Sequence, residues 1–352
     1  ELFFMRNIIK YLLILFALLS CRDELVTVNL AGDQHTHTHV EISSNGFPTM
    51  LIPNDNQLSV EGIDLGRKLF YDPVLSRDST QSCSSCHQQK HAFSDPKQFS
   101  VGIDGISGER NASAIINAGW QSSVFWDGRV YSLEEQALDP VPNPIEMHLG
   151  WDKAIIRLNN SDYKDLFKSA FGEDVITKEL VAMAIAQFER TLISDNAKFD
   201  KFLKGELVLS PLEAAGFNLF FSEKAECFHC HGRPLFTDDD LHNNGLDDVF
   251  GDMGQEEVTG KNADRGKFRT PTLRNIEFTA PYMHDGRFNS LEEVIDFYSD
   301  SIKTSSTVDP LMPNDNGGFH WTPLEKLQLV SFLKTLSDTS FVSNPDFQSP
   351  YE

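Results

Sequence analysis

Apolar residues recur at helical spacing in two long stretches of the chain, Thr177 to Ile193 and Pro323 to Leu336. Pro211 and Pro323 stand where helices would begin, and proline is tolerated there because the first turn has no partner for an N–H. The chain shows no series of alternating, strand-like segments. The pattern therefore predicts a mainly α fold.

Four positions carry a capping box, in which Ser or Thr is followed three residues later by Glu. The side chain of each first residue can accept a backbone N–H that the helix leaves unpaired. We expect a helix to begin after the first residue of each pair: Ser132 with Glu135, Ser210 with Glu213, Ser290 with Glu293, and Thr322 with Glu325.

Two motifs of the form Cys-x-x-Cys-His carry the most specific chemistry in the chain. In such a motif both thiols bind the vinyl groups of haem, and the histidine is the proximal ligand of the iron. A four-thiolate zinc site, small disulfides or a thioredoxin-like pair are alternatives, but none explains a histidine after both pairs. We predict two covalent haem c groups and a redox function, with these attachment residues: Cys83, Cys86, His87, Cys227, Cys230 and His231.

The chain also contains an internal repeat. The stretch from Trp126 to Glu135 matches the stretch from His284 to Glu293, and an asparagine stands ten residues before the repeated aspartate in both halves. A Gly-x-x-Leu-Phe sequence precedes each haem motif. A duplication of this kind predicts two homologous units. We expect two cytochrome-c-like domains with one haem each, an N-terminal domain at 57–205 and a C-terminal domain at 206–352.

The chain is long enough for two domains and strongly acidic. It has 352 residues, with 52 acidic against 30 basic side chains and a formal net charge of -22. Such a surface repels nucleic acid and attracts a basic partner, such as a small electron-donor protein. Solubility alone explains the charge equally well.

The N-terminus has the features of an export signal. Arg6 and Lys10 precede an apolar run from Tyr11 to Leu19, which is too short to span a membrane. The run ends in Leu-Leu-Ser-Cys21, which resembles a bacterial lipoprotein box and implies cleavage before Cys21 and a lipid on its thiol. An uncleaved anchor is the alternative. We expect a signal peptide at 1–20, a flexible tether at 21–56, and a membrane-anchored body on the periplasmic side.

Besides the two haem motifs, the chain contains four specific segments: Phe125 to Arg129, Glu135 to Ala137, Pro144 to Met147, and Thr279 to His284. With them, the chain from about Val60 to Leu336 resembles the bacterial di-haem cytochrome c peroxidases and the related MauG enzymes. The resemblance implies reduction of hydrogen peroxide to water in a peroxidatic N-terminal domain, with electrons that enter through the second haem, in a C-terminal electron-transfer domain, from a small cytochrome or cupredoxin. A MauG-like, peroxide-dependent oxidation of a protein substrate is the alternative, and a non-enzymatic di-haem electron carrier is a third.

The resemblance assigns roles around the first haem. Trp126 matches a tryptophan between the two haems, which relays electrons. Gln136, Pro140 and Glu146 match the peroxide pocket. The chemistry supports Glu146 independently, because O–O cleavage needs a proton moved from one peroxide oxygen to the other, and a nearby carboxylate can take and return it.

The resemblance also implies a calcium site between the domains, formed by Asn111 and the backbone carbonyls of Thr279 and Pro281. These are oxygen ligands, which calcium prefers. Dimers are common among such enzymes, so a homodimer stays open.

The loop after the first haem site departs from the family pattern. In peroxidases that need reductive activation, a histidine of this loop binds the iron at rest. The matching stretch is Ser100 to Asp104, and Ile103 stands at the position of the histidine. Isoleucine cannot bind iron, so we expect an open first haem. His91 is near in sequence, but we assign it to a solvated loop.

The sixth ligand of the second haem is the other departure. The family usually places a methionine fourteen residues after the histidine of its Pro-Tyr-x-His motif. Counted from His284, this position is Tyr298, as in MauG. A tyrosinate favours higher oxidation states of iron and lowers its potential. Met312 and Met283 are the rival ligands, and a core tyrosine without a metal is a further alternative.

Overall fold

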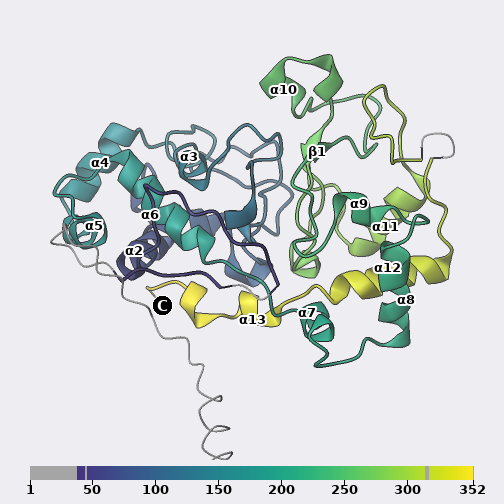
Figure 1. Cartoon of the computed structure of the whole chain (residues 1–352). Helices are drawn as coiled ribbons and strands as arrows, with labels where there is room; N and C mark the ends of the chain where they lie inside the picture. Colours follow the sequence, from purple (N-terminus) through teal and green to yellow (C-terminus); the bar gives the residue numbers. More distant parts are fainter. Residues whose placement is uncertain (1–37, 44–45, 314–316, 352) are drawn as a thin grey trace, which may run out of the picture.

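The computed structural model describes residues 38–43, 46–313 and 317–351, and these form a mainly helical protein (Figure 1). The predicted mainly α fold is confirmed. Within these ranges the sheet consists of two short antiparallel strands, β1 (Leu241–His242) and β2 (Phe268–Arg269). The helices are α2 (Val60–Tyr71), α3 (Leu133–Ala137), α4 (Trp151–Asn159), α5 (Tyr163–Phe171), α6 (Lys178–Arg190), α7 (Lys198–Leu203), α8 (Pro211–Phe220), α9 (Cys227–Cys230), α10 (Glu256–Thr259), α11 (Leu291–Asp300), α12 (Pro323–Lys334) and α13 (Thr339–Val342).

All four predicted helix starts are present. Helices α3, α8, α11 and α12 begin directly after the expected cap residue, whose side chain accepts the N–H of the glutamate three residues on. At α8 and α12 the box is complete, because the glutamate also accepts the N–H of the cap residue. At α3 and α11 the glutamate reaches one residue further and accepts the N–H of Tyr131 (3.4 Å) or Asn289 (2.6 Å).

The repeated Gly-x-x-Leu-Phe sequence marks a close helix crossing in each half. Helix α2 packs on α6, and α8 packs on α12. A Cβ atom on Gly66 would lie 1.9 Å from the carbonyl oxygen of Ala184, and one on Gly216 would lie 1.9 Å from that of Gln328. Only glycine allows this approach of two backbones, so the repeat in sequence corresponds to a repeat in packing.

The repeated asparagines also have equivalent surroundings. Asn117 and Asn275 both have a positive φ, 53° and 58°. The side-chain oxygen of Asn117 accepts the N–H of Ser194 (2.8 Å), and that of Asn275 accepts the N–H of Asp338 (2.7 Å). Each bond ties the loop before the repeat to the chain that follows α6 or α12. These matches support an internal duplication, while the domain limits at 57–205 and 206–352 stay predictions.

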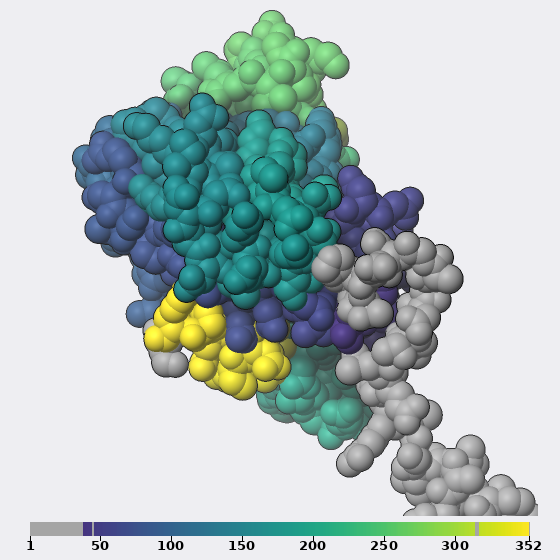
Figure 2. All heavy atoms as spheres, turned by 90° about the vertical axis from the view of Figure 1, so that its left-hand side faces the viewer, coloured from purple at the N-terminus to yellow at the C-terminus, as the bar shows by residue number. Residues whose placement is uncertain are grey.

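Two large apolar cores lie one in each half of the chain. The first extends from Leu65 to Ile185 in sequence and the second from Phe199 to Leu336. The C-terminal segment after α12 returns to the first half, where Figure 2 shows it in yellow against the blue and teal residues. There Phe341 packs on Phe93, with ring centroids 5.6 Å apart, and both belong to one core cluster. The C-terminus thus ties the second half to the first.

Part of the predicted tether at 21–56 is packed rather than flexible. Met50 and Asn56 are buried, and Trp120 Nε1 donates to the carbonyl of Pro48 (2.8 Å). The packed body therefore begins before residue 57, because Met50 and Asn56 are already buried. The predicted signal peptide and Cys21 lie outside the described residues. Within the described ranges, no helix is both long and apolar enough to cross a membrane.

Candidate functional site

The two Cys-x-x-Cys-His motifs line two separate cavities. Among the described residues, no group of side chains that could hold one metal ion combines thiols of both motifs. Burial raises the pKa of Cys83, Cys227 and Cys230 to about 12, opposite to the low pKa of a reactive redox thiol, and the thiols form no disulfides within the described chain. The lining residues from the motifs are Cys86 and His87 in the first cavity, and Cys227, Cys230 and His231 in the second.

Both motif histidines are oriented in the same way. Nδ1 of His87 lies 3.0 Å from the carbonyl oxygen of Phe93, and Nδ1 of His231 lies 3.0 Å from that of Phe236. A bond from Nδ1–H to a carbonyl fixes the tautomer and leaves Nε2 available to a metal. Burial lowers the pKa of both imidazoles, which favours the neutral, metal-binding form. The residues present therefore fit two haem c groups.

The first cavity brings together the residues expected in a peroxide pocket. Gln136, at the end of α3, lines it together with Pro140, Glu146 and His87. Its volume is about 900 Å³, against about 220 Å³ for the cavity beside the second motif. The first cavity thus has more room for a small substrate.

Glu146 is held in this cavity by a neighbouring amide. Its Oε1 accepts a hydrogen bond of 2.7 Å from Asn143 Nδ2. Burial, followed by the negative charge of Asp139, raises the pKa of Glu146, while Asn143 and Arg129 act in the opposite direction. The shift moves the pKa towards neutral pH, where a carboxyl can both take and give a proton.

The loop at residues 100–109 is packed against the segment that carries Glu146. Ile103 N donates to the carbonyl of Glu146 (2.8 Å), and a Cβ on Gly102 would lie 2.1 Å from the carbonyl oxygen of Ile145. Gly102 lines the first cavity, but among the described residues that do so neither Ile103 nor His91 is present. The loop therefore brings no imidazole to this cavity.

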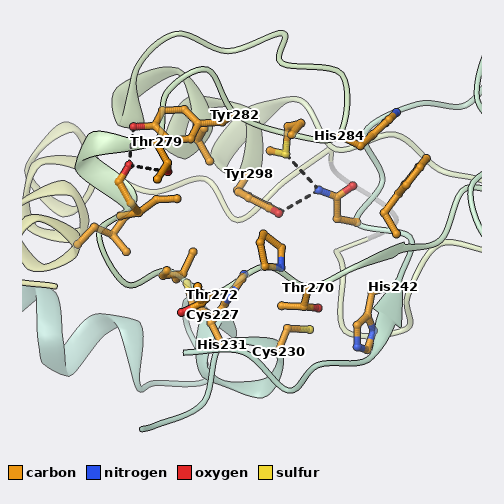
Figure 3. A pocket seen from close by; sticks show the side chains of 18 of the residues that line it. Cys227, Cys230, His231, His242, Thr270, Thr272, Thr279, Tyr282, His284 and Tyr298 are labelled. Atoms are coloured by element: carbon orange, nitrogen blue, oxygen red, sulfur yellow. Dashed lines mark hydrogen bonds between the residues drawn. The ribbon is translucent and has the colours of Figure 1, made fainter. Parts of the chain in front are cut away.

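The second cavity contains all three proposed sixth ligands. Tyr298 on α11, Met283 and Met312 line it. Figure 3 shows Tyr298 across the cavity from Cys227 and His231. Burial raises the pKa of the Tyr298 phenol to about 12, and a 3.0 Å hydrogen bond from Asn244 opposes this rise.

Trp126 lies at the boundary between the cavities and lines both. Its Nε1 donates to the backbone carbonyl of Asn111 (2.8 Å). Asn111 in turn lines the second cavity with Thr279 and Pro281, the other residues of the expected calcium site. The side-chain nitrogen of Asn111 donates to the carbonyls at 97 and 98, both at 3.1 Å, so only its side-chain oxygen would be available to a cation.

Three polar residues of the cavities were not expected from the sequence. Glu189 at the end of α6 lines the first cavity, is 4% exposed, and has a pKa that burial raises to about 8. Asn143 stands three residues before Glu146, a spacing that could have indicated the contact. Asn244 and Tyr298 are 54 residues apart, so no local pattern connects them.

Comparison with known proteins places the chain in a family. The profile described as "Di-haem cytochrome c peroxidase" matches residues 60–207. The chain is 34% identical to methylamine utilization protein MauG of Methylophilus methylotrophus, over 81% of this chain and 84% of that protein. It is 36% identical to cytochrome c551 peroxidase of Nitrosomonas europaea, over 82% of each.

A solved structure agrees with these relatives. The crystal structure of a MauG-like protein associated with microbial copper homeostasis matches with a TM-score of 0.81 and 36% identity, covering 88% of this chain and all (100%) of that one. Two haems are implied by this family. The chain therefore belongs to the di-haem cytochrome c peroxidase family and is an oxidoreductase of that family.

Proposed function

We propose that this protein reduces hydrogen peroxide to water in the first cavity, with electrons from a small redox protein. The observation that carries the proposal is the arrangement of Glu146, Gln136 and His87 around one roomy cavity. The strongly acidic chain, with a net charge of -22, suits a basic donor protein.

Two haem c groups, one in each half at 57–205 and 206–352, supply the electron-transfer and peroxide-binding chemistry. Cys83, Cys86 and His87 would hold the first. Cys227, Cys230 and His231 would hold the second, with Tyr298 as its further ligand. The half-buried thiols and the oriented imidazoles of the two cavities support this assignment.

The polar residues of the first cavity handle the protons. Glu146 takes a proton from one peroxide oxygen and returns it to the other, which leaves as water. Asn143 holds the carboxylate in place through Oε1, and the Gln136 amide positions the peroxide by hydrogen bonds. With two electrons and a further two protons from solvent, one peroxide gives two waters.

Trp126 is placed to carry electrons between the cavities. It lines both, and its hydrogen bond to the Asn111 carbonyl fixes the indole plane. Asn111, Thr279 and Pro281 would bind calcium next to it. A lipid on Cys21 would anchor the protein on the periplasmic side.

A MauG-like oxidation of a protein substrate is the second candidate function. Tyr298 favours it, because an anionic oxygen ligand stabilises higher oxidation states of iron. The relatives include both peroxidases and MauG proteins.

Steady-state peroxide turnover with a small cytochrome or a dye as donor tests the proposal, run with and without pre-reduction. Fast donor oxidation supports a peroxidase. Peroxide consumption that needs a protein substrate and not a donor supports the MauG-like function. A denatured mass without two haems would mean that the protein does not carry them covalently. An oxidised protein that is purely low-spin and does not react with peroxide would be an electron carrier.

A further inference from the structure

Arg269 is a buried cation at the boundary between the two cavities. It ends strand β2, where its N–H donates to the backbone carbonyl of Trp126 (2.8 Å). Its side chain is 4% exposed and lines both cavities. The segment that follows it, Thr270 to Leu273, runs along the wall of the second cavity (Figure 3).

The guanidinium of Arg269 is only partly paired. Its Nε and Nη1 are both buried and make no hydrogen bond, and Arg269 is the one arginine in ranges 38–43, 46–313 and 317–351 with two such nitrogens. The carboxylate of Asp239 is near, but its Oδ1 lies 3.6 Å from Nη1 and is itself buried without a hydrogen bond. The other Asp239 oxygen accepts the N–H of Ser122. A buried charge with open donors is costly unless a further group completes it.

An anion with a planar pair of acceptors would complete the pairing of the Arg269 guanidinium. A guanidinium presents a rigid fork of donors, which a carboxylate matches with two parallel hydrogen bonds. Each haem carries two propionate carboxylates, and a haem attached through Cys227 and Cys230 would share its cavity with Arg269. Asp239 alone does not satisfy the fork at the observed distance.

We propose that Arg269 binds a propionate carboxylate of the second haem and, as a positioning residue, sets the potential of that haem. The inference rests on the proposed attachment of haem at the second motif. The cation balances the propionate charge. Without the cation of Arg269, the negative charge of the propionate stabilises the oxidised iron, so the potential of the second haem falls.

Redox titration of the purified di-haem protein, followed by optical and paramagnetic resonance spectra, tests the assignment. We expect Arg269→Gln to shift the second haem to lower potential and to make this potential pH-dependent near neutrality, because the freed propionate then takes up a proton. Arg269→Lys keeps the charge and should restore most of the potential. Arg265→Gln removes an exposed charge from the same segment and should change little.

The Asp239→Asn variant distinguishes an electrostatic effect of Arg269 on the potential of the second haem from a purely structural effect. It removes a negative charge near Arg269, so it should shift the potential upwards, whereas Arg269→Gln shifts it downwards. Equal shifts in one direction would overturn the proposal. If Arg269→Gln does not accumulate, the Arg269→Lys protein is compared with the parent by resonance Raman, where the haem propionate bending mode should move.

An unchanged propionate mode in Arg269→Lys, or an unchanged potential in Arg269→Gln, overturns the role of Arg269. A denatured mass that shows no haem on the second motif overturns the proposed function instead. The two failures are therefore distinguishable.

Discussion

The phenol oxygen of Tyr298 accepts a 3.0 Å hydrogen bond from Asn244 Nδ2 inside the second cavity. Asn244 Nδ2 also lies 3.8 Å from the sulfur of Met283. A donor aimed at a phenol oxygen stabilises the phenolate, whereas burial raises its pKa to about 12. A phenolate at this position would therefore need a cation beside it, and an iron held by His231 would supply one if Tyr298 is its further ligand.

Replacement of Tyr298 should alter the second haem. Tyr298→Phe should open the iron or recruit Met283 or Met312, which changes its spin state. Tyr298→Met should raise its potential, because a neutral thioether replaces an anionic oxygen. Paramagnetic resonance and redox titration measure both effects, with Met312→Leu as the matched control. If only Met312→Leu changes the second haem, Met312 is the ligand.

Glu146→Gln should lower peroxide turnover by about a hundred-fold or more, as expected when a positioned acid–base is lost. The absorption spectra of both haems should stay as in the parent. Glu173→Gln, which changes an exposed carboxylate of the same half, is the control. Full turnover in Glu146→Gln would assign the proton transfer to another residue.

Asn143→Leu tests the same carboxyl through its pKa. The bond from Asn143 lowers the pKa of Glu146, so its removal should raise that pKa. The acid limb of the turnover profile should then move to higher pH, because Glu146 must be ionised to take a proton. An unmoved acid limb would show that another group sets it.

The Glu189 carboxyl should make stability fall as the pH rises. Burial raises its pKa from 4.5 to about 8 in the folded protein; the charge of Arg190 opposes this rise and that of Glu134 adds to it. Between these two values the folded state keeps a proton that the unfolded state has lost, so the free energy of unfolding decreases as pH increases. The Glu189→Gln variant has no ionisable group at this position. Over this pH range, its free energy of unfolding should therefore fall by a few kcal/mol less than that of the parent.

Urea unfolding at pH 5 and pH 9 measures this effect. The loss of stability between the two pH values should be smaller in Glu189→Gln than in the parent. Glu179→Gln, an exposed change on the same helix, should behave as the parent does. Identical losses in Glu189→Gln and the parent would contradict the prediction.

The helical fold could be predicted because its signals are local. The starts of α8 and α12 follow from Ser210 and Thr322, whose caps depend on residues three positions away. The repeat was visible for the same reason, since Gly66 and Gly216 occur in identical short motifs. The contact between Phe341 and Phe93 could not be predicted from the sequence, because no pattern in the C-terminal segment indicates which half of the chain it contacts.

The candidate site was predictable only where a motif carried it. His87, Gln136 and Glu146 belong to short, specific sequences, and all three line the first cavity. The places of Arg269 and Glu189 in the cavities were not predicted, because arginine and glutamate side chains usually lie on the protein surface. Their significance comes from burial, which depends on segments far apart in the chain.

By resemblance, Ile103 stands where peroxidases that need reductive activation have an iron-binding histidine. Ile103 N donates to the carbonyl of Glu146, and Gly102 packs under Ile145, so the loop is fixed and itself brings no imidazole to the first cavity. We therefore expect a high-spin signal from the first haem in the fully oxidised protein and a direct reaction with peroxide, without pre-reduction.

The Ile103→His variant offers the missing ligand. It should show a low-spin fraction and should need one electron before it reacts with peroxide. The Ile106→His variant, changed at an exposed neighbour in the same loop, should show neither effect. Paramagnetic resonance followed by rapid mixing with peroxide measures both. A purely low-spin parent protein that reacts only after reduction would mean that another residue closes the site, and His91→Ala would then be the first variant to test.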